Sequence, residues 1–537
     1  MNAKSIHRGE STRTRISAVL LVVLTLIVMG RLCAAEFVQV DDPQTIANNP
    51  AFNPPQVAKI AEYWIKPEGS LYIPLTYSVW GALAFIARVA QPDEFGSFLN
   101  PWVFHTANVV LHCITTLIVF AILRAIVKNR SAAWVGAAIF AVHPVQVETV
   151  AWASGTKDLL CALFICAAVL ALLRSRERNR GVILANVFTL AACFSKPTGI
   201  IAPAVLLIID TLVCGTNWRR SLRTLWPTFV IAVAFAIVGV IVQPPLMTEV
   251  TPLWQRPLVA LDALSFYVWK LLWPANLGID YGRTPARIIA SGAIWWTWIV
   301  PVALIAIVVA ARNRLIIAGI SLFILGVAPV LGLVPFTFQT ISTVADHYMY
   351  PAMLGVALLV ATATTTFEAC LQKRCQEPFS GKRFLTPFFV GCVLMVFLLM
   401  RAFAAAGTWR NNSTLFANAL DVNPRSAFSH TNWGVALAKH GDESAALDHF
   451  RQAVAVDPDY AFGHSNLGGF LRARGQYTGA AAEYRELLRV YRKQRNFDPA
   501  LGVSLQQVID QLEQLAARHT TQPTAQPATQ PTTQEAR

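Results

Sequence analysis

Two adjacent carboxylates, Asp41 and Asp42, stand a few residues after the first apolar segment of the chain. A carboxylate just outside an apolar segment can take a proton from a hydroxyl group as a general base. Ionisable groups near the bilayer are costly unless they have a partner or a function. The alternative is structural, because Asp-Asp-Pro is also a sequence that ends a helix and begins a turn. Taken alone, the acid pair favours the turn, so the rest of the chain has to decide.

The composition predicts an all-α, polytopic membrane protein. The chain has 537 residues, of which 55% are hydrophobic and 14% charged, and its mean hydropathy is +0.48. These values exclude an ordinary soluble protein, and many apolar runs reach the ~20 residues that span a bilayer. The net charge of +14 would suit a nucleic-acid partner. The positive charges instead form short clusters between apolar runs, where they orient helices, so no nucleic-acid partner is predicted.

Basic clusters set the predicted topology, with about eleven spans in a membrane domain over residues 1–408. The arginines of 174–180 mark an inner loop, and the basic N-terminus keeps the start of the first helix inside. The first outer segment is 36–102, and everything after Trp409 is outside. Apolar stretches at 71–87 and 258–273 are placed at the outer surface. The predicted spans lie at about 16–34, 103–125, 131–150, 157–173, two within 181–213, 225–243, 292–311, 315–334, one ending near 367, and 385–406.

The first apolar segment also ends like a signal peptide, in Leu-Cys-Ala-Ala. The many later spans favour a retained helix, with cleavage as the alternative.

The last part of the chain contains an internal repeat with a period of 34 residues. The segment 426–434 is echoed by 460–468, and Gly441 is echoed by Gly475. Small and aromatic residues alternating at this period are typical of tetratricopeptide repeats, which form binding grooves. We predict a small α-solenoid with a capping helix over 409–517. The remaining 518–537, rich in Thr, Pro and Gln, is predicted to be disordered.

Motifs on the predicted outer side resemble those of the transmembrane and tetratricopeptide-repeat O-mannosyltransferases. The resemblance covers the chain to about residue 492, and it departs in the small number of repeats and in Ile73, where members more often have a basic residue. The motifs that carry it are Asp41-Asp42-Pro with Asn48-Asn49-Pro50, Tyr72-Ile73-Pro74-Leu75-Thr76, Phe104-His105 with Asn108 and His112, His143-Pro144 with Glu148, Gly155 and Asp158, Ile279-Asp280-Tyr281, and His347-Tyr348 with Tyr350.

The resemblance implies a C-type glycosyltransferase (GT-C) body and a polyprenyl-phosphate sugar donor. It maps Asp41 on the catalytic base of the first outer loop, with Asp42 beside it. The implied reaction moves a hexose, with mannose favoured, to Ser or Thr hydroxyls of translocated proteins on the non-cytoplasmic side. The solenoid would bind the protein acceptor or an accessory protein. A lipid or glycan acceptor, and a non-catalytic tetratricopeptide scaffold, stay open as alternatives.

A transfer from a lipid phosphate also needs groups that hold the leaving phosphate. The candidates for binding donor or substrate are His143, Glu148, Lys157, Lys196, His347 and Tyr348. Arg88 is a further candidate cation. Each charge could instead cap a helix or reach the membrane surface, and Glu148 could simply pair with Lys157. No metal ligand set is predicted, because an Asp-x-Asp spacing is lacking, although two carboxylates leave a divalent cation open.

Overall fold

The computed structural model describes residues 3–521, except 70, 94–95, 176–177, 244–250, 375–384 and 494–496. Most of the predicted disordered tail, from residue 522 onward, lies outside the described residues. The described part of the chain contains helices, three isolated bridges and no strand, which confirms the all-α class.

Twenty-two α-helices occur in the described residues, in two groups along the chain. The helices before the repeat region are α1 (Ala3–Met29), α2 (Val57–Glu62), α3 (Pro74–Ala87), α4 (Pro101–Val127), α5 (Arg130–Val142), α6 (Val147–Ala151), α7 (Thr156–Arg174), α8 (Arg178–Ser195), α9 (Ala202–Ile208), α10 (Trp218–Val242), α11 (Arg256–Leu272), α12 (Pro285–Ala290), α13 (Ile299–Ala310), α14 (Arg314–Val327), α15 (Met353–Arg374) and α16 (Leu385–Thr408). The repeat region contains α17 (Asn412–Val422), α18 (Ala427–Lys439), α19 (Glu443–Val456), α20 (Ala461–Ala473), α21 (Tyr477–Arg492) and α22 (Pro499–Thr521).

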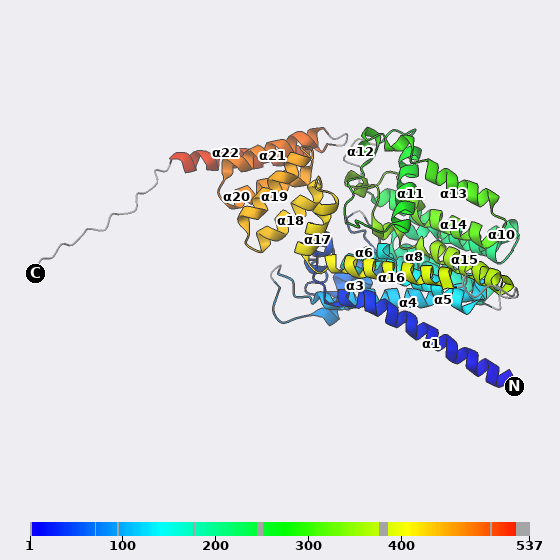
Figure 1. The fold of residues 1–537 in the computed structure, drawn as a ribbon. Coiled ribbons are helices and arrows are strands. Elements are labelled where there is room, and N and C mark those ends of the chain that lie inside the picture. Colours follow the sequence, from blue (N-terminus) through cyan, green and yellow to red (C-terminus); the bar gives the residue numbers. More distant parts are fainter. Residues whose placement is uncertain are drawn as a thin grey trace, which may run out of the picture.

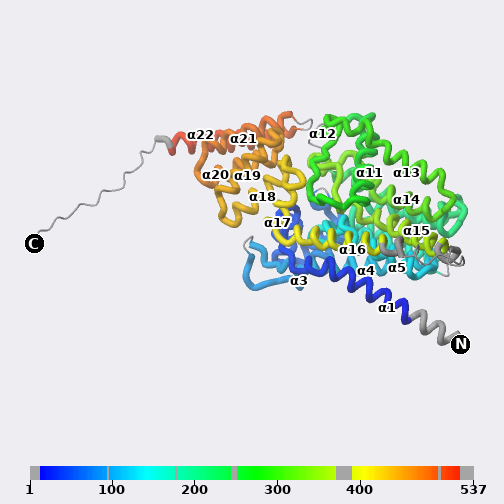
Figure 2. The backbone as a smooth tube through the Cα atoms, in the orientation of Figure 1, coloured from blue at the N-terminus to red at the C-terminus, as the bar shows by residue number. Residues whose placement is uncertain are grey.

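The helices α1–α16 form one elongated body, and α17–α22 form a smaller helical array at one end of it (Figure 1). Within the body α4 packs on α5 and α7, α7 packs on α8, and α15 packs on α5 and α14. The helix α1 runs along α4, α5 and α16, and its C-terminal end lies near the helical array (Figure 2). Apolar side chains from these helices merge into one buried cluster.

Among the described residues, seven helices are long and apolar enough to cross a membrane, or eight if one bent pair is a single span. The chain is thus a multi-pass membrane protein. Reaching the predicted eleven spans requires the bent pair and three of the four shorter apolar helices, Pro74–Ala87, Asn179–Ser195, Pro197–Val213 and Arg314–Val330. The helix α11 is neither one of the long candidate spans nor one of the four shorter apolar helices, and it packs against α12 and α13.

The span predicted at 131–150 is not one straight helix. The chain breaks at His143 and bends by 51° between Arg130–Val142 and Pro144–Ala151. Pro144 cannot donate a backbone hydrogen bond and disfavours helical geometry in the residue before it, which explains the break. After the bend, the turn 153–155 meets the first outer segment, where Ser154 donates to Asp42.

Three of the segments predicted to lie inside meet at one end of the body. Arg124 donates to Thr14, and Asn129 and Ser131 donate to Glu368 at 2.5 and 2.8 Å. At the opposite end, the backbone of Glu36 donates to Arg410 at 3.0 Å, which joins the first predicted outer segment to the start of the repeat region. The structure therefore sorts the predicted loops into two ends of the body.

We expect a cysteine placed at Ser504, on the exposed face of α22, to react with a membrane-impermeant maleimide in cells whose envelope admits the reagent. A cysteine placed at Ser175, just after α7, should not react. The physical reason is that basic loops stay on the cytoplasmic side, which puts the other end of the body outside. Because the chain has native cysteines, the amount of label on each variant is compared with the amount on the unsubstituted chain. The reverse labelling pattern would overturn the orientation.

The repeat region is an array of helix pairs whose close packing follows from the repeated small residues. A Cβ on Gly434 would lie 2.8 Å from Phe450, and one on Gly468 would lie 3.1 Å from Tyr484. Gly441 and Gly475 end equivalent helices with φ of +83° and +71°, a conformation that favours glycine. The assignment to the tetratricopeptide family and its start at 409 stay predictions. The helix α22 runs to Thr521, past the predicted start of the tail at 518.

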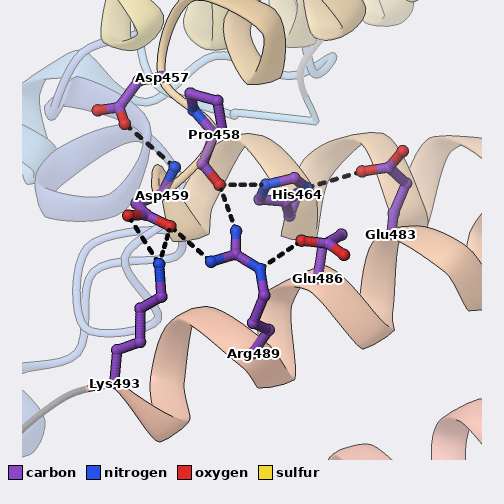
Figure 3. A network of polar contacts seen from close by, with 8 residues as sticks. All are labelled: Asp457, Pro458, Asp459, His464, Glu483, Glu486, Arg489 and Lys493. Atoms are coloured by element: carbon purple, nitrogen blue, oxygen red, sulfur yellow. Dashed lines mark hydrogen bonds and ion pairs between the residues drawn. The ribbon is translucent and has the colours of Figure 1, made fainter.

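Charged side chains fasten the turn between α19 and α20 to the next helix pair (Figure 3). Arg489 donates to Asp459 at 2.8 Å and to the Pro458 carbonyl at 2.9 Å, and Lys493 binds Asp459 at 3.0 Å. His464 lies between the Pro458 carbonyl and Glu483, at 3.0 and 2.7 Å. The recurring histidines of the repeat thus act in packing.

The helix α17 joins the two parts of the molecule. Leu415, Phe416 and Ala419 belong to the buried cluster of the body, and burying a side chain such as Phe416 stabilises by about 1.5–3 kcal/mol. Asn418 donates to the Leu277 carbonyl at 2.8 Å. The array is therefore fixed to the body through its first helix.

Candidate active site

The acid pair begins a single helical turn at 43–47, and its two carboxylates face different surroundings. Asp42 is fully buried. One of its oxygens accepts from the Val38 backbone at 3.1 Å, and the other accepts from the backbone and hydroxyl of Ser154 at 2.9 and 2.8 Å. Asp42 thereby ties the first outer segment to the turn 153–155. This geometry favours a positioning role for Asp42.

Asp41 is the carboxylate of the pair that a substrate can reach. Its side chain is 47% exposed, and an oxygen lies 3.7 Å from Nζ of Lys157. Lys157 stands in the first turn of α7, and its Nζ lies 4.5 Å from the ring centre of Trp152. The arrangement places an accessible base beside a fixed cation.

A second cation is brought to the same helix end. Lys196, in the bend after α8, forms an ion pair with Asp158, the neighbour of Lys157 on α7. Nζ of Lys196 also lies 5.4 Å from the ring centre of Tyr348. Two lysines thus flank the N-terminus of a 19-residue helix. The helix dipole favours an anion at the same place.

The third element of the site is a buried acid–imidazole pair. Nδ1 of His347 lies 2.5 Å from Oε1 of Glu148. Burial, with Lys196 and Lys157 nearby, lowers the pKa of His347 well below its usual range, so the imidazole is neutral. The ring packs edge-on to Trp152 at 5.5 Å and to Tyr348 at 4.2 Å. Trp152 therefore links this pair to the Asp41–Lys157 pair.

Behind His347 lies a further group of polar residues. The hydroxyl of Tyr281 donates to both oxygens of Asp346 at 2.9 Å. Burial raises the pKa of Asp346 to about 7, while Lys270 and Tyr281 act in the opposite direction. Lys270 donates to the carbonyls of Ala275 and Asn276 at 2.7 and 2.8 Å. These groups support the loop that carries His347.

Two candidates have a different environment. His143 stands at the break between α5 and α6, where its Nε2 lies 3.0 Å from the Leu271 carbonyl and its Nδ1 accepts from the Val145 backbone at 3.4 Å. These contacts give it a structural role at the bend. Arg88 follows α3 and is exposed. Glu148 pairs with His347, and Lys157 pairs with Asp41. The alternative of a Glu148–Lys157 pair is therefore wrong.

Sequence reasoning named Asp158 only as a motif residue, and it assigned no role in the site to Trp152, Ser154, Asp158, Lys270 or Asp346. Asp158 had the clearest signal, since it is an acid next to a lysine at the start of an apolar helix. Other motif residues hold the helices together. Asn108 bridges the Trp152 carbonyl and Thr156 at 2.8 and 2.7 Å, and His112 contacts Tyr350 at 2.8 Å. In the described part of the chain, no group of three or more His, Cys, Asp or Glu is arranged to hold a metal ion.

Residues 95–242 match the family described as dolichyl-phosphate-mannose-protein mannosyltransferase. Protein O-mannosyl-transferase F38B6.6 of Caenorhabditis elegans is 24% identical over 466 residues, covering 81% of this chain and 62% of that protein. Protein O-mannosyl-transferase TMTC4 of Homo sapiens is 27% identical over 428 residues, covering 65% of this chain and 54% of that protein. The predicted family resemblance is confirmed. The chain spans between about half and two thirds of the length of these two relatives.

The match to the mannosyltransferase family covers Glu148, Lys157 and Lys196, but neither Asp41 nor His347. A solved structure described as ArnT from Cupriavidus metallidurans bound to undecaprenyl phosphate is 14% identical, covering 88% of this chain and 80% of that one, with a TM-score of 0.38.

We expect the wild type to gain stability over an Asp42→Asn variant as the pH falls from 7 to 5. Burial raises the pKa of Asp42 from 3.8 to about 6. Between pH 3.8 and pH 6 the Asp42 carboxyl group holds a proton in the folded chain and has lost it in the unfolded chain. Its stabilising contribution to folding is therefore fully present below pH 3.8 and is lost as the pH rises through 6. The gain between pH 7 and pH 5 is about 1 kcal/mol. Thermal unfolding in detergent at both pH values measures it, and a difference that does not change with pH would contradict the assignment.

Proposed function

We propose that the chain is a membrane glycosyltransferase that moves a hexose, with mannose favoured, from a polyprenyl monophosphate to Ser or Thr hydroxyls of polypeptides on the non-cytoplasmic side. The observation that carries the proposal is the exposed carboxylate of Asp41, 3.7 Å from Lys157 at the N-terminus of α7. A base and an anion site lie side by side there, as transfer from a lipid phosphate requires.

In the proposed step, Asp41 accepts the proton of the acceptor hydroxyl as its oxygen attacks the anomeric carbon. The bond between that carbon and the phosphate oxygen breaks, and the polyprenyl phosphate leaves with the bonding electron pair. Lys157 and Lys196 stabilise the negative charge that develops on this phosphate, because preorganised cations favour the transition state over the ground state.

The other members of the cluster position these groups. Asp42 and Ser154 fix the turn that carries Asp41, through the hydrogen bonds at 2.8–2.9 Å. Asp158 orients Lys196. The Glu148–His347 pair fixes the imidazole with Nδ1 toward the carboxyl group, which leaves Nε2 free to form a hydrogen bond with the sugar or acceptor. Tyr348 lies under Lys196 as a wall of the donor site.

Transfer of radiolabelled mannose from a polyprenyl-phosphate carrier into membranes with and without the chain tests this proposal. The labelled products are separated into protein, lipid and glycan fractions. We expect chain-dependent label in protein that is released by cleavage of Ser- and Thr-linked sugars. Label that depends on the chain but stays in lipid or glycan would favour the alternative acceptors, and no chain-dependent label would favour a scaffold.

A further inference from the structure

A cleft of about 590 Å³ lies between the membrane body and the first helix pair of the array. Its size falls within the ~300–1,000 Å³ that is usual for ligand pockets. The body contributes residues near 251–255, 280–289 and 335–341, and the array contributes residues near 425–428 and 456–460. Neither part forms this cleft alone.

The walls of the cleft are fixed in place by contacts between body and array. Asp280, buried in the body, accepts from the hydroxyl of Ser426 at 2.5 Å and from the amide of Asn423 at 3.2 Å. The backbone of Gly282 donates to its other oxygen at 2.6 Å. A binding surface held this way loses little freedom when a ligand enters.

The charges in the cleft leave arginine donors open. The two acids that line it are both engaged, Asp280 by the three donors above and Asp457 by the backbone of Asp459 at 3.1 Å (Figure 3). Arg425 is exposed, and its guanidinium has no ion pair among the described residues. Arg287 lies beside the Arg425 backbone and donates to its carbonyl at 3.4 Å, and its charge also acts on Asp280. A carboxylate entering the cleft would therefore meet two guanidinium groups.

Aromatic rings continue the cleft in both directions. Phe428 and Tyr460 line its wall on the array, and Phe462, the repeat equivalent of Phe428, is 68% exposed further along. Toward the body, the ring of Phe336 lines the cleft and packs on Tyr348 at 6.0 Å, and Tyr348 is the residue under Lys196. Phe336 thus lies between the cleft and Tyr348 of the candidate active site.

We propose that this cleft binds the acceptor as an extended polypeptide segment that carries an acidic side chain near its Ser or Thr, with the carboxylate on Arg425 and Arg287. Rings spaced along a groove suit an extended chain, and the two arginines select a carboxylate at one position along it. That the bound peptide is the acceptor of the sugar rests on the proposed function. That the cleft binds an acidic peptide does not.

Equilibrium binding of fluorescent peptides to the purified full-length chain in detergent tests the cleft without any donor. Three extended Ser/Thr peptides differ at one position, which is Glu, Gln or Lys. We expect the Glu peptide to bind about tenfold more tightly than the Gln peptide, as one charge-assisted contact would give. The Arg425→Glu variant should reverse the order and prefer the Lys peptide, and Arg425→Gln should remove the preference.

The matched control is Arg451→Glu, because Arg451 is exposed on α19 and does not line the cleft. This variant should bind all three peptides as the wild type does. A gain of affinity for the Lys peptide in Arg425→Glu cannot come from misfolding, which keeps the test valid if that variant is less stable. Unchanged peptide preference in the Arg425 variants would overturn the proposal. The same holds if only the amount of bound anionic lipid changes, which would assign Arg425 to a lipid head group.

The outcomes separate this inference from the proposed function. Charge-dependent binding without any sugar transfer would support the cleft as a peptide-binding site and contradict the proposed transferase activity. Sugar transfer to all three peptides at equal rates and affinities would support the transferase activity and contradict the proposed peptide-binding role of the cleft.

Discussion

Asp41→Asn is expected to lower the rate of sugar transfer by about 10²–10⁴-fold while the chain stays folded. The amide has nearly the shape of the carboxylate, but it cannot accept the proton of the acceptor hydroxyl. Because the Asp41 side chain is 47% exposed and its ion pair with Lys157 is 3.7 Å long, the loss of charge there changes stability little. The measurement is the initial rate of transfer at saturating donor and acceptor.

The matched control is Glu62→Gln, an exposed acid at the end of α2 in the same outer segment. It should transfer sugar at the wild-type rate. A near-normal rate in Asp41→Asn would move the base elsewhere, and Glu148 would be the next residue to test.

Lys196→Met is expected to lower transfer by about 10²–10³-fold, the usual loss when one donor to a developing negative charge is removed. It should also destabilise the fold by about 3–5 kcal/mol, because it leaves Asp158 buried without its cation. The side chains of Lys196 and Asp158 are only 13% and 4% exposed, so solvent does not replace the lost partner.

The double variant Lys196→Met, Asp158→Asn separates the two effects. Removing both charges should restore most of the unfolding temperature, because no unpaired buried charge is left. Transfer should stay low if Lys196 stabilises the leaving phosphate. A double variant with wild-type turnover would show that Lys196 is not needed for the transfer step.

The sequence predicts much of the fold because membrane helices follow simple rules of length and charge. The apolar runs and basic clusters locate most of the long helices, and the 34-residue echo locates the helix pairs of the array. The bend at His143 was missed, although Pro144 marks it. The role of α17 was also missed, because the side that buries Leu415 and Phe416 faces the body, a neighbour that helical periodicity does not reveal.

The site is predictable only in part, because its contacts join residues far apart in the chain. The motifs name Asp41 and His347, and the need for cations beside the phosphate names Lys157 and Lys196. Spacing along the chain does not tell that Asp41 meets Lys157 or that His347 meets Glu148. The different surroundings of Asp41 and Asp42 arise from the turn 153–155, which folds back onto one carboxylate and leaves the other open. Such a distinction needs the tertiary structure.

The most direct test of the central proposal uses the purified chain, a polyprenyl-phosphate-mannose donor and a defined Ser/Thr peptide. Fragmentation mass spectrometry of the peptide then locates any added sugar. The account predicts one hexose on a Ser or Thr hydroxyl, formed together with an equal amount of free polyprenyl phosphate, and neither product with Asp41→Asn. A peptide that stays unmodified while the wild-type chain is folded and the donor is consumed would contradict transfer to protein. Equal modification by wild type and Asp41→Asn would contradict the assignment of the base.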